Sequence, residues 1–217
     1  MSDLSLTILA ETAGDAQAID RLHERTFGPG RFVLSAYRLR EHVDHLLDLS
    51  FTARIGTLLV GSVRQLPVLI GDSRALLLGP LTVEPPFRGR GVGRALLDRA
   101  LKDARAKGHR LVLLVGDEAY YGRVGFKTIP KGQASMPGPV DYNRLLVAEL
   151  VDGTGINLPR IVPVRAASVF RGDGWMGVKM RDASVVRGVG VLPLFAGLIG
   201  LLLLLGAFAA TWLREGR

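Results

Sequence analysis

Apolar segments bounded by turn residues predict several strands between the N-terminus and residue 150, and the first of them alternates apolar and polar positions. The first such segment is followed by Thr12-Ala13-Gly14, which reads as a turn. Gly71-Asp72-Ser73 is a tight turn that would join two long strands into an antiparallel hairpin. The predicted strands of this kind are 4–9 (half-buried), 51–55, 57–70, 74–83 and 145–150.

Other segments repeat their apolar residues every three or four positions, which predicts helices. The first helix has Asp15 as its expected cap and ends at Gly28, and the second covers Ser35–Leu47. The third begins at Val92 and ends at Lys107-Gly108. One face of this third helix would carry Val92, Ala95, Leu96, Ala100, Leu101 and Ala104.

The middle of the chain combines these patterns into a strand–helix–strand crossover. Residues 111–115 are continuously apolar, as expected of a strand buried on both faces, and a short helix is expected over 118–124. Residues 166–170 would be a last piece of the domain. The order of elements predicts an α/β or α+β domain with a mixed sheet.

The C-terminal region shows neither the alternation expected of a strand nor the repeat every three or four positions expected of an amphipathic helix. From Gly188 to Leu213, 26 residues carry no charge and 19 of them are hydrophobic. A helix of this length extends about 39 Å, more than the roughly 30 Å of a bilayer's hydrocarbon core. Trp212 would lie at one interface. The predicted organisation is a folded body (1–170), a basic connector (171–187), a transmembrane helix (188–213) and a charged tail (214–217).

Charge and composition narrow the classes of partner. The net charge is +8, but no basic run typical of a nucleic-acid arm is present, so no nucleic-acid partner is expected. The chain has no cysteine, which excludes disulfides, thiolate nucleophiles and Cys-ligated zinc. Met1-Ser2-Asp3-Leu4-Ser5 lacks the pattern of a secretory signal, and we therefore expect a cytoplasmic body on a single-pass membrane protein.

The loop between the predicted strand 74–83 and the helix from Val92 contains the clearest candidate chemistry. Its glycines let the backbone approach a ligand, and amide N–H groups at a helix start form a concavity for an anion. The glycines match neither Gly-x-Gly-x-x-Gly nor a nucleoside-triphosphate loop. A diphosphate fits best, and a plain glycine turn is the alternative. The residues are Arg88, Gly89, Arg90, Gly91, Gly93 and Arg94.

Two motifs in this order resemble the GNAT N-acetyltransferase superfamily. Arg88-x-x-Gly91-x-Gly93 resembles its acetyl-CoA pyrophosphate motif, after a Leu-Thr-Val-Glu-Pro strand end that looks like the family's fourth strand. Tyr120-Tyr121-Gly122-Arg123-Val124-Gly125-Phe126 is similar to its Tyr-x-Lys-x-Gly-Phe element. The likeness spans about residues 4–150 and is nearest to small bacterial members with Gly-Asp-x-x-Tyr-Tyr before Gly-Phe.

The resemblance implies a GNAT-like, mostly antiparallel sheet flanked by helices, with acetyl-CoA as co-substrate and no metal. The loop amides would hold the pyrophosphate, and the strand before the loop would be splayed from its neighbour. The Leu81 N–H would then face the thioester carbonyl and Val83 the pantetheine amide. The implied cofactor-binding residues are Leu81, Thr82, Val83, Arg88, Gly89, Arg90, Gly91, Val92, Gly93 and Arg94.

The resemblance also implies catalytic residues. Tyr121 aligns with the tyrosine that protonates the departing thiolate, and the alternative is that Tyr120 and Tyr121 simply pack in the core. Glu84 and, less directly, Glu118 stand near the right elements for a general base, although an ordered water would serve as well. The histidines fall outside both motifs, and we expect none of them to be a catalyst.

These observations together predict a membrane-tethered enzyme that transfers acetyl from acetyl-CoA to a primary amine by direct attack. The asparagine that many family members carry before the tyrosine element is replaced by Gly116-Asp117, so the resemblance does not identify the acceptor. Two alternatives stay open. One is a catalytically inactive CoA-binding membrane adaptor, and the other is an acyltransferase that uses a longer acyl donor and a lipid-like acceptor.

Overall fold

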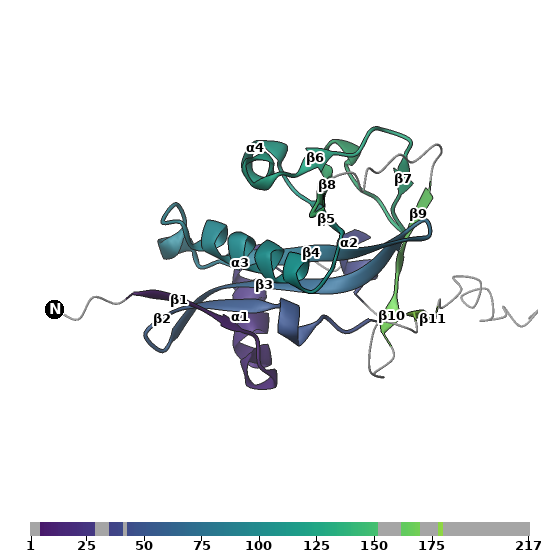
Figure 1. The fold of residues 1–217 in the computed structure, drawn as a ribbon. Helices are drawn as coiled ribbons and strands as arrows, with labels where there is room; N and C mark the ends of the chain where they lie inside the picture. Colours follow the sequence, from purple (N-terminus) through teal and green to yellow (C-terminus); the bar gives the residue numbers. More distant parts are fainter. Residues whose placement is uncertain (1–4, 29–34, 41–42, 152–161, 170–177, 180–217) are drawn as a thin grey trace, which may run out of the picture. The chain divides into compact units, whose positions relative to one another are not determined.

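A mixed β-sheet forms the centre of the protein in the computed structural model, which describes residues 5–28, 35–40, 43–151, 162–169 and 178–179. Nine strands of these residues follow the order β1-β2-β3-β4-β5-β8-β6, with β9 beside β3 and β7 beside β9 (Figure 1). The β4–β5 and β7–β9 pairs are parallel. The strands are β1 (Leu6–Ala10), β2 (Phe51–Ile55), β3 (Leu58–Ile70), β4 (Ser73–Val83), β5 (Leu111–Val115), β6 (Lys127–Thr128), β7 (Ala134–Ser135), β8 (Leu145–Glu149) and β9 (Val162–Ala166), and a separate pair joins β10 (Ser168–Val169) to β11 (Val178–Lys179).

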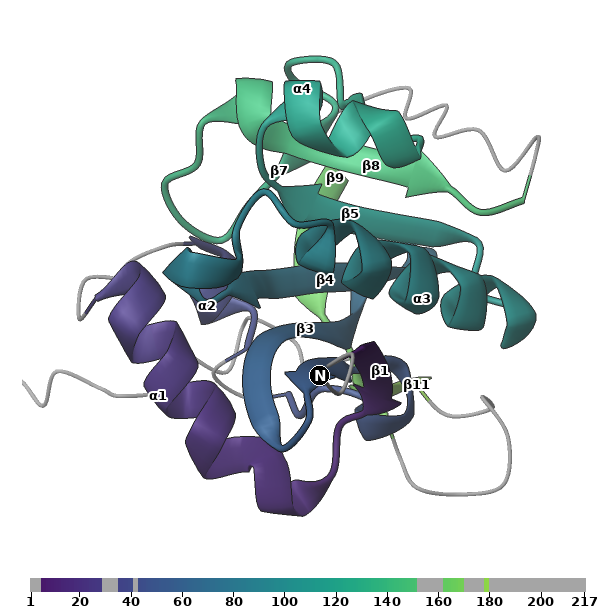
Figure 2. The same ribbon diagram turned by 90° about the vertical axis from the view of Figure 1, so that its left-hand side faces the viewer.

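Helices cover both faces of the sheet (Figure 2). Neighbouring residues of β3 show this arrangement, because Gly61 lies against α3 while the side chain of Ser62 meets His23 of α1. Successive strand residues point to opposite faces, so the two helices lie on opposite sides of β3. The helices and short 3₁₀ turns are η1 (Ala13–Asp15), α1 (Ala16–Phe27), α2 (Ser35–Arg38), η3 (Leu47–Leu49), η4 (Pro85–Phe87), α3 (Val92–Ala106), α4 (Glu118–Tyr121), η5 (Gly122–Val124) and η6 (Tyr142–Arg144).

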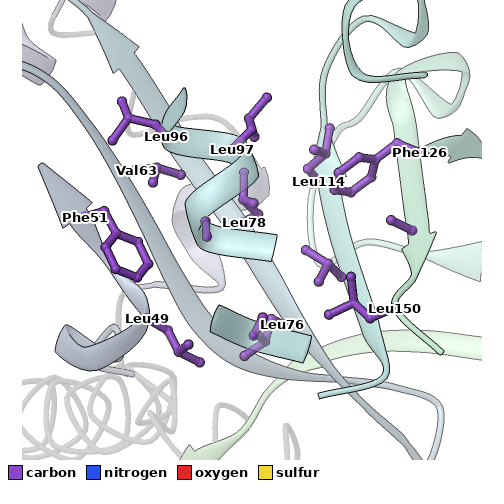
Figure 3. Packing of buried hydrophobic residues seen from close by; sticks show 14 of the residues in the cluster. Leu49, Phe51, Val63, Leu76, Leu78, Leu96, Leu97, Leu114, Phe126 and Leu150 are labelled. Carbon is purple, nitrogen blue, oxygen red and sulfur yellow. The ribbon is translucent and has the colours of Figure 1, made fainter. Parts of the chain in front are cut away.

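The core is divided between the two faces of the sheet. On β4, Leu76 and Leu78 belong to the cluster under α3, whereas Leu77 belongs to the cluster on the other face. Figure 3 shows the α3 cluster, in which Leu96 and Leu97 project from the helix toward the sheet. The strand β5 divides its side chains in the same way, which confirms the prediction that residues 111–115 are buried on both faces.

The predicted hairpin and the crossover helix are present. Strands β3 and β4 turn at Gly71 and Asp72 and pair antiparallel over most of their length. On α3, four of the six residues predicted for the inner face are fully buried, while Ala95 and Leu101 are partly buried. Leu97, which was not assigned to that face, is buried as well. The mixed sheet and its flanking helices therefore agree with the predicted fold class.

The prediction of a helix over Ser35–Leu47 is wrong. Only its first turn is present, because the α2 helix ends at Arg38, residues 43–46 form no regular element, and Leu47–Leu49 form the 3₁₀ turn η3. The N–H of Leu46 donates to the carbonyl of Gln65 on β3 at 2.8 Å. This tertiary hydrogen bond replaces the i to i−4 bond that a continued helix would need.

Two predictions near the N-terminus also need correction. Strand β1 runs from Leu6 to Ala10 and lies at the edge of the sheet, so Leu6 and Leu9 are exposed. Ile8, which is partly buried, is the residue of this strand that packs against the core. Asp15 is the N-cap residue of α1, as predicted, but its carboxylate makes no capping hydrogen bond to α1 and accepts instead from the N–H and the hydroxyl of Thr12, both at 2.8 Å. It therefore stabilises the turn before the helix rather than an amide of α1.

The C-terminal predictions fall largely outside the described residues. Strands β6, β7 and β9 were not predicted, and residues 166–170 contribute the end of β9 and the short β10. Apart from β11, the predicted connector (171–187) lies outside the described residues, as do the apolar run (188–213) and the tail (214–217). Among the described residues, none of the helices has both the length and the hydropathy needed to cross a bilayer.

Candidate active site

Strands β4 and β5 separate in the middle of the sheet. They pair only at Leu76 and Leu77 of β4, both of which precede a bulge at Gly79-Pro80. The bulge places Gly79 and Pro80 together opposite the single Arg64 of β3. A bulge bends its own strand, and here it bends β4 away from β5. The splayed strand that the resemblance implies is therefore present, and from Leu78 onward β4 pairs with β3 alone among the described strands.

A cavity of about 590 Å³ occupies the region where the two strands separate. Leu81 and Tyr121 both line it, so the structure brings together two residues that sequence motifs placed forty positions apart. The wall is mixed in character, with apolar, aromatic and charged side chains. Its residues are Phe27, Ala36, Arg40, Leu78, Gly79, Pro80, Leu81, Leu114, Val115, Gly116, Asp117, Tyr120, Tyr121, Pro139, Val140, Asp141 and Arg144.

The end of β4 alternates between the two faces of the sheet. Leu81 and Val83 are half-buried and pack against the core cluster of α3. The side chain of Thr82 is buried, and Thr82 does not belong to the cavity wall. Val83 does not line the cavity either, so Leu81 is the one residue of 81–83 on its wall.

The loop after β4 has the backbone conformation that its glycines were expected to allow. Gly89 and Gly91 have φ angles of 73° and 82°, in the left-handed region that favours glycine. Gly91 is the N-cap of α3, and its carbonyl accepts from the N–H of Ala95 at 2.9 Å. The amides of the first helical turn, including Val92 and Gly93, have no acceptor within the helix and carry the positive end of its dipole. This end of α3 is suited to an anion.

Three arginines surround the loop, all of them exposed. The Nε of Arg88 donates to the carbonyl of Val83 at 3.2 Å, and the Arg90 guanidinium lies 5.9 Å from the centre of the Phe87 ring. Arg94 donates to both oxygens of Asp98 at 2.8 and 2.9 Å and to the carbonyl of Arg123. Arg94 therefore connects α3 to η5, in addition to contributing charge.

Tyr121 is held rigidly beside the cavity. Its ring covers Gly116, where any Cβ would collide with it, and it meets the rings of Tyr120 and Phe126 edge-on at 4.9 and 6.0 Å between centroids. Burial, followed by the neighbouring Tyr120 and Asp117, raises the pKa of Tyr121 to about 12. The side chain thus packs against the core, as the packing alternative predicted, and also lines the cavity.

Tyr120 is placed differently from its neighbour. It is 43% exposed, and its hydroxyl would lie 2.6 Å from a Cβ at Gly93, which puts it over the first turn of α3. Burial also raises the pKa of Tyr120, whereas Arg94 opposes that shift. The close approach of Tyr120 therefore requires a glycine at position 93.

The two carboxylates considered as bases do not line the cavity. Glu84 forms an ion pair with Arg25 of α1. Glu118 accepts a hydrogen bond from the hydroxyl of Thr128 at 2.5 Å. Neither carboxylate is among the groups that a ligand in the gap would meet.

The histidines of the described residues also lie outside the cavity wall. His23 is hydrogen-bonded to Ser62 at 3.3 Å, and His45 to Glu11 at 2.9 Å. His109 is buried, and burial lowers its pKa. His42 lies outside the described residues. No group of three or more His, Asp and Glu side chains that could hold a metal ion occurs in the described part of the chain.

Several residues of the wall were not singled out from the sequence as site residues. Phe27 ends α1, Arg40 follows α2, and Asp141 and Arg144 belong to the loop around η6. None of them belongs to a motif, and Arg40 was assigned to a helix that ends before it. No local pattern in the sequence would have identified them.

Comparisons with known proteins agree with this geometry. The sequence profile of the "Acetyltransferase (GNAT) domain" family matches residues 49–128. The uncharacterized N-acetyltransferase YhbS of Escherichia coli K12 is 32% identical over 124 residues, which are 56% of this chain and 74% of that protein.

Solved structures give the same result. The GNAT family N-acetyltransferase YhbS from Escherichia coli, in complex with CoA, superposes with a TM-score of 0.64 at 25% identity over 75% of this chain and 91% of that one. An acetyltransferase of the GNAT family from Staphylococcus aureus shares the fold at a TM-score of 0.52 and 16% identity, covering 68% of this chain and 100% of that one. The sequence match to YhbS shows that this chain belongs to the GNAT family of N-acetyltransferases.

Proposed function

We propose that this protein is an acetyl-CoA-dependent N-acetyltransferase whose acetyl donor lies between the separated strands β4 and β5. One observation carries the proposal: Leu81 and Tyr121 line the same cavity, and Tyr120, which also lines it, reaches over Gly93 at the start of α3. The structure of YhbS in complex with CoA, from a relative with the same fold, supports the choice of donor. We refer to β4 from Leu78, the 88–94 loop and Tyr121 as the donor side.

The pyrophosphate of the donor would bind to the amides at the start of α3. Backbone N–H groups and the helix dipole stabilise an anion there without requiring a particular side chain. The exposed arginines Arg88, Arg90 and Arg94 add positive charge around the pyrophosphate site. Solvent screens these charges, which reduces their contribution to binding. We therefore assign the loop backbone, more than the arginines, as the main determinant of donor binding.

The reaction begins when the neutral amine attacks the thioester carbonyl carbon. The oxygen then becomes negatively charged, and the N–H of Leu81 donates to it, an interaction worth about 3 kcal/mol in comparable acyl-transfer sites. The C–S bond breaks and the sulfur leaves with its electron pair. The products are an amide and the CoA thiol, and the proton lost by the amine balances the one gained by sulfur.

Tyr121 would assist the departure of sulfur mainly as a hydrogen-bond donor. Its pKa of about 12 keeps the phenol protonated in the empty site. A thiol has an ordinary pKa near 8.5, so complete proton transfer from this phenol to the thiolate is uphill by about 3.5 units, or roughly 5 kcal/mol. Burial of the thiolate raises the pKa of the thiol as well, which makes the difference between the pKa of the thiol and that of Tyr121 smaller.

We also propose that residues 188–213 anchor the body to the cytoplasmic face of a membrane. The support is the length of the uncharged apolar run and the basic residues that precede it. Truncation after Asp182 should move the protein from the membrane fraction to the supernatant with its activity retained. A truncated chain that still sediments with membranes would contradict the anchor.

An amine panel with labelled acetyl-CoA and the purified full chain tests the proposed reaction. The expected result is label in at least one amide product, together with release of one CoA thiol per amide formed. Saturable acetyl-CoA binding with no label transferred to any amine would favour an inactive CoA-binding adaptor instead. Faster transfer from a longer acyl-CoA would favour the longer-chain acyltransferase.

A further inference from the structure

The part of the cavity wall outside β4 and outside residues 111–121, which run from β5 through α4, has its own chemical character. It consists of the lining residues of α1, of the α2 segment and of residues 139–144, and we call it the acceptor wall. If the donor occupies the gap between β4 and β5, an amine must approach the thioester from this wall. Its side chains therefore determine which amine fits.

Arg40 supplies the least exposed charge of the acceptor wall. It is half-buried, whereas Asp141 and Arg144 are exposed. Its Nη2 would lie 3.4 Å from a Cβ at Gly79, so the guanidinium reaches the bulge of β4, two positions before Leu81. A positive group is thus fixed next to the strand that would hold the thioester carbonyl.

Two other charged residues of the cavity wall, Arg144 and Asp117, form an ion pair. The Nε of Arg144 lies 3.1 Å from Oδ1 of Asp117, and both side chains are exposed at the mouth of the cavity. A carboxylate oxygen of Asp141 accepts from the N–H of Asn143 at 3.0 Å. Asp117, Asp141 and Arg144 are all exposed, so solvent screens their charges more than that of the half-buried Arg40.

A partly buried guanidinium favours a planar anion, because its N–H groups match the two oxygens of a carboxylate. A polyamine would instead place additional positive charges against Arg40 and Arg144. The rest of the wall is largely apolar, with Phe27 and Val140 among its residues. The volume of about 590 Å³ must also contain the acetyl end of the donor, so the acceptor is a small molecule.

We propose that the acceptor is a free amino acid with an apolar side chain, whose carboxylate binds Arg40. This inference rests on the proposed acetyl transfer. The carboxylate fixes the acceptor so that its amine nitrogen faces the thioester, and the side chain lies against Phe27 and Val140. The nitrogen forms the new bond to the acetyl carbon, the C–S bond breaks, and the amine proton is balanced by protonation of the CoA sulfur.

Matched pairs of acceptors test this inference on the purified full chain with labelled acetyl-CoA. Each pair consists of an amino acid and the amine that lacks only its carboxylate: leucine with 3-methylbutylamine, and phenylalanine with phenethylamine. We expect a kcat/KM for the better amino acid about 10- to 150-fold above that of its amine, the range for a hydrogen-bonded charge pair. Equal values within a pair would overturn the inference.

Substitution of the arginine distinguishes recognition from packing. Arg40→Gln should raise the KM for the amino acid by about the same factor and leave the kcat/KM for the matched amine unchanged. Arg40→Lys, which keeps the charge but not the two-pronged geometry, should recover part of the loss. The control is Arg38→Gln, an exposed α2 arginine outside the cavity wall, which should behave as the native protein. An equal loss for both members of a pair in Arg40→Gln would contradict a carboxylate-binding role.

Calorimetric titration with acetyl-CoA separates this inference from the proposed function. Arg40→Gln should bind acetyl-CoA as the native chain does. If acetyl-CoA binds and polyamines or protein amines are acetylated in preference to amino acids, the acceptor class is wrong and the acetyltransferase stands. If acetyl-CoA does not bind, or no amine of any class is acetylated, the proposed function fails and this inference fails with it.

Discussion

On the donor side of the cavity the groups offered to a ligand are chiefly backbone atoms, whereas on the acceptor wall they are side chains. The donor side uses one continuous segment, from Leu78 through the first turn of α3, with Tyr121 opposite. The acceptor wall collects Phe27, Arg40 and Arg144 from three segments far apart in sequence. A backbone site for a constant donor tolerates many side chains, so a family can change its acceptor by changing the other wall.

The largest expected effect comes from filling the donor side. Gly93→Val should abolish measurable acetyl-CoA binding in calorimetry, because any Cβ meets the Tyr120 hydroxyl at 2.6 Å and intrudes at the start of α3. The matched control is Gly14→Val, since a Cβ at Gly14 meets only ordinary contact at 3.7 Å. Unchanged donor affinity in Gly93→Val, at an unchanged melting temperature, would remove the basis for placing the pyrophosphate there.

A smaller but still large effect is expected from Tyr121→Phe. Loss of the hydroxyl should lower kcat by about 100-fold and leave the Kd for acetyl-CoA within about twofold, because the role is confined to the departing sulfur. Tyr142→Phe, at an exposed tyrosine outside the cavity wall, serves as the control. A kcat equal to that of the native enzyme would reduce Tyr121 to a packing residue.

The pH dependence of kcat is a second test of the role assigned to Tyr121. Since burial raises the pKa of Tyr121 to about 12, its phenol stays protonated up to that pH. The pH profile of kcat for the native enzyme should therefore contain no falling limb below about pH 11 that is due to Tyr121. Any falling limb below that pH should remain in Tyr121→Phe. A falling limb near pH 9 that disappears in the variant would contradict the assigned protonation state.

An ion cluster around the buried Glu11 should make the stability of the fold sensitive to acid. Glu11 accepts from Arg64 at 2.7 Å and from His45 at 2.9 Å, five residues beyond Arg40. Burial alone would raise the pKa of Glu11, but the hydrogen bonds from His45 and Arg64 outweigh it, so the pKa is lowered from 4.5. Because the folded pKa is below the unfolded one, this stabilisation is present above about pH 4.5 and is lost as the pH falls further.

Glu11→Gln tests that cluster through thermal unfolding followed by circular dichroism. At pH 7 the variant should lose about 3 kcal/mol, because Arg64 keeps its charge at a largely buried site without the carboxylate. Its free energy of unfolding should also fall less than that of the native protein between pH 5 and pH 3. The control is Asp20→Asn, whose exposed carboxylate lies 3.7 Å from the same arginine and should cost under about 0.5 kcal/mol. Similar losses in both variants would contradict the account.

The smallest effect is expected at Glu84. Its carboxylate pairs with Arg25 and does not line the cavity, so Glu84→Gln should change kcat/KM by less than about threefold across the pH range. A steady-state assay with the best acceptor from the amine panel measures this. A loss of 100-fold or more that grows toward low pH would restore Glu84 as the general base.

The donor side could be predicted from the sequence because its geometry is encoded locally. Gly91 marks a helix N-cap in the left-handed region, and the alternating residues before it mark the end of a strand. The strand–loop–helix unit around Gly91 needs few distant contacts to take this form. The separation of β4 from β5 was implied by family resemblance, and its physical cause is a bulge at Gly79-Pro80 that the pattern of hydrophobic residues does not reveal.

The acceptor wall could not be predicted because it depends on tertiary contacts. The apolar spacing from Ser35 to Leu47 favours a helix, but the hydrogen bond from Leu46 to Gln65 draws the chain along β3 instead. That path helps to place the segment that carries Arg40. Likewise, Asp141 and Arg144 lie in a loop whose position depends on the pairing of β8 with β5.

An NMR titration of the ¹⁵N-labelled full chain with acetyl-CoA tests the central claim most directly, because it reports on individual backbone amides. The account predicts that the largest shifts occur at Leu81 and at the amides from Gly91 to Arg94, with Arg40 little affected until an amino acid is added. Saturable binding of acetyl-CoA that leaves the amides of Leu81 and of the first turn of α3 unshifted would contradict it.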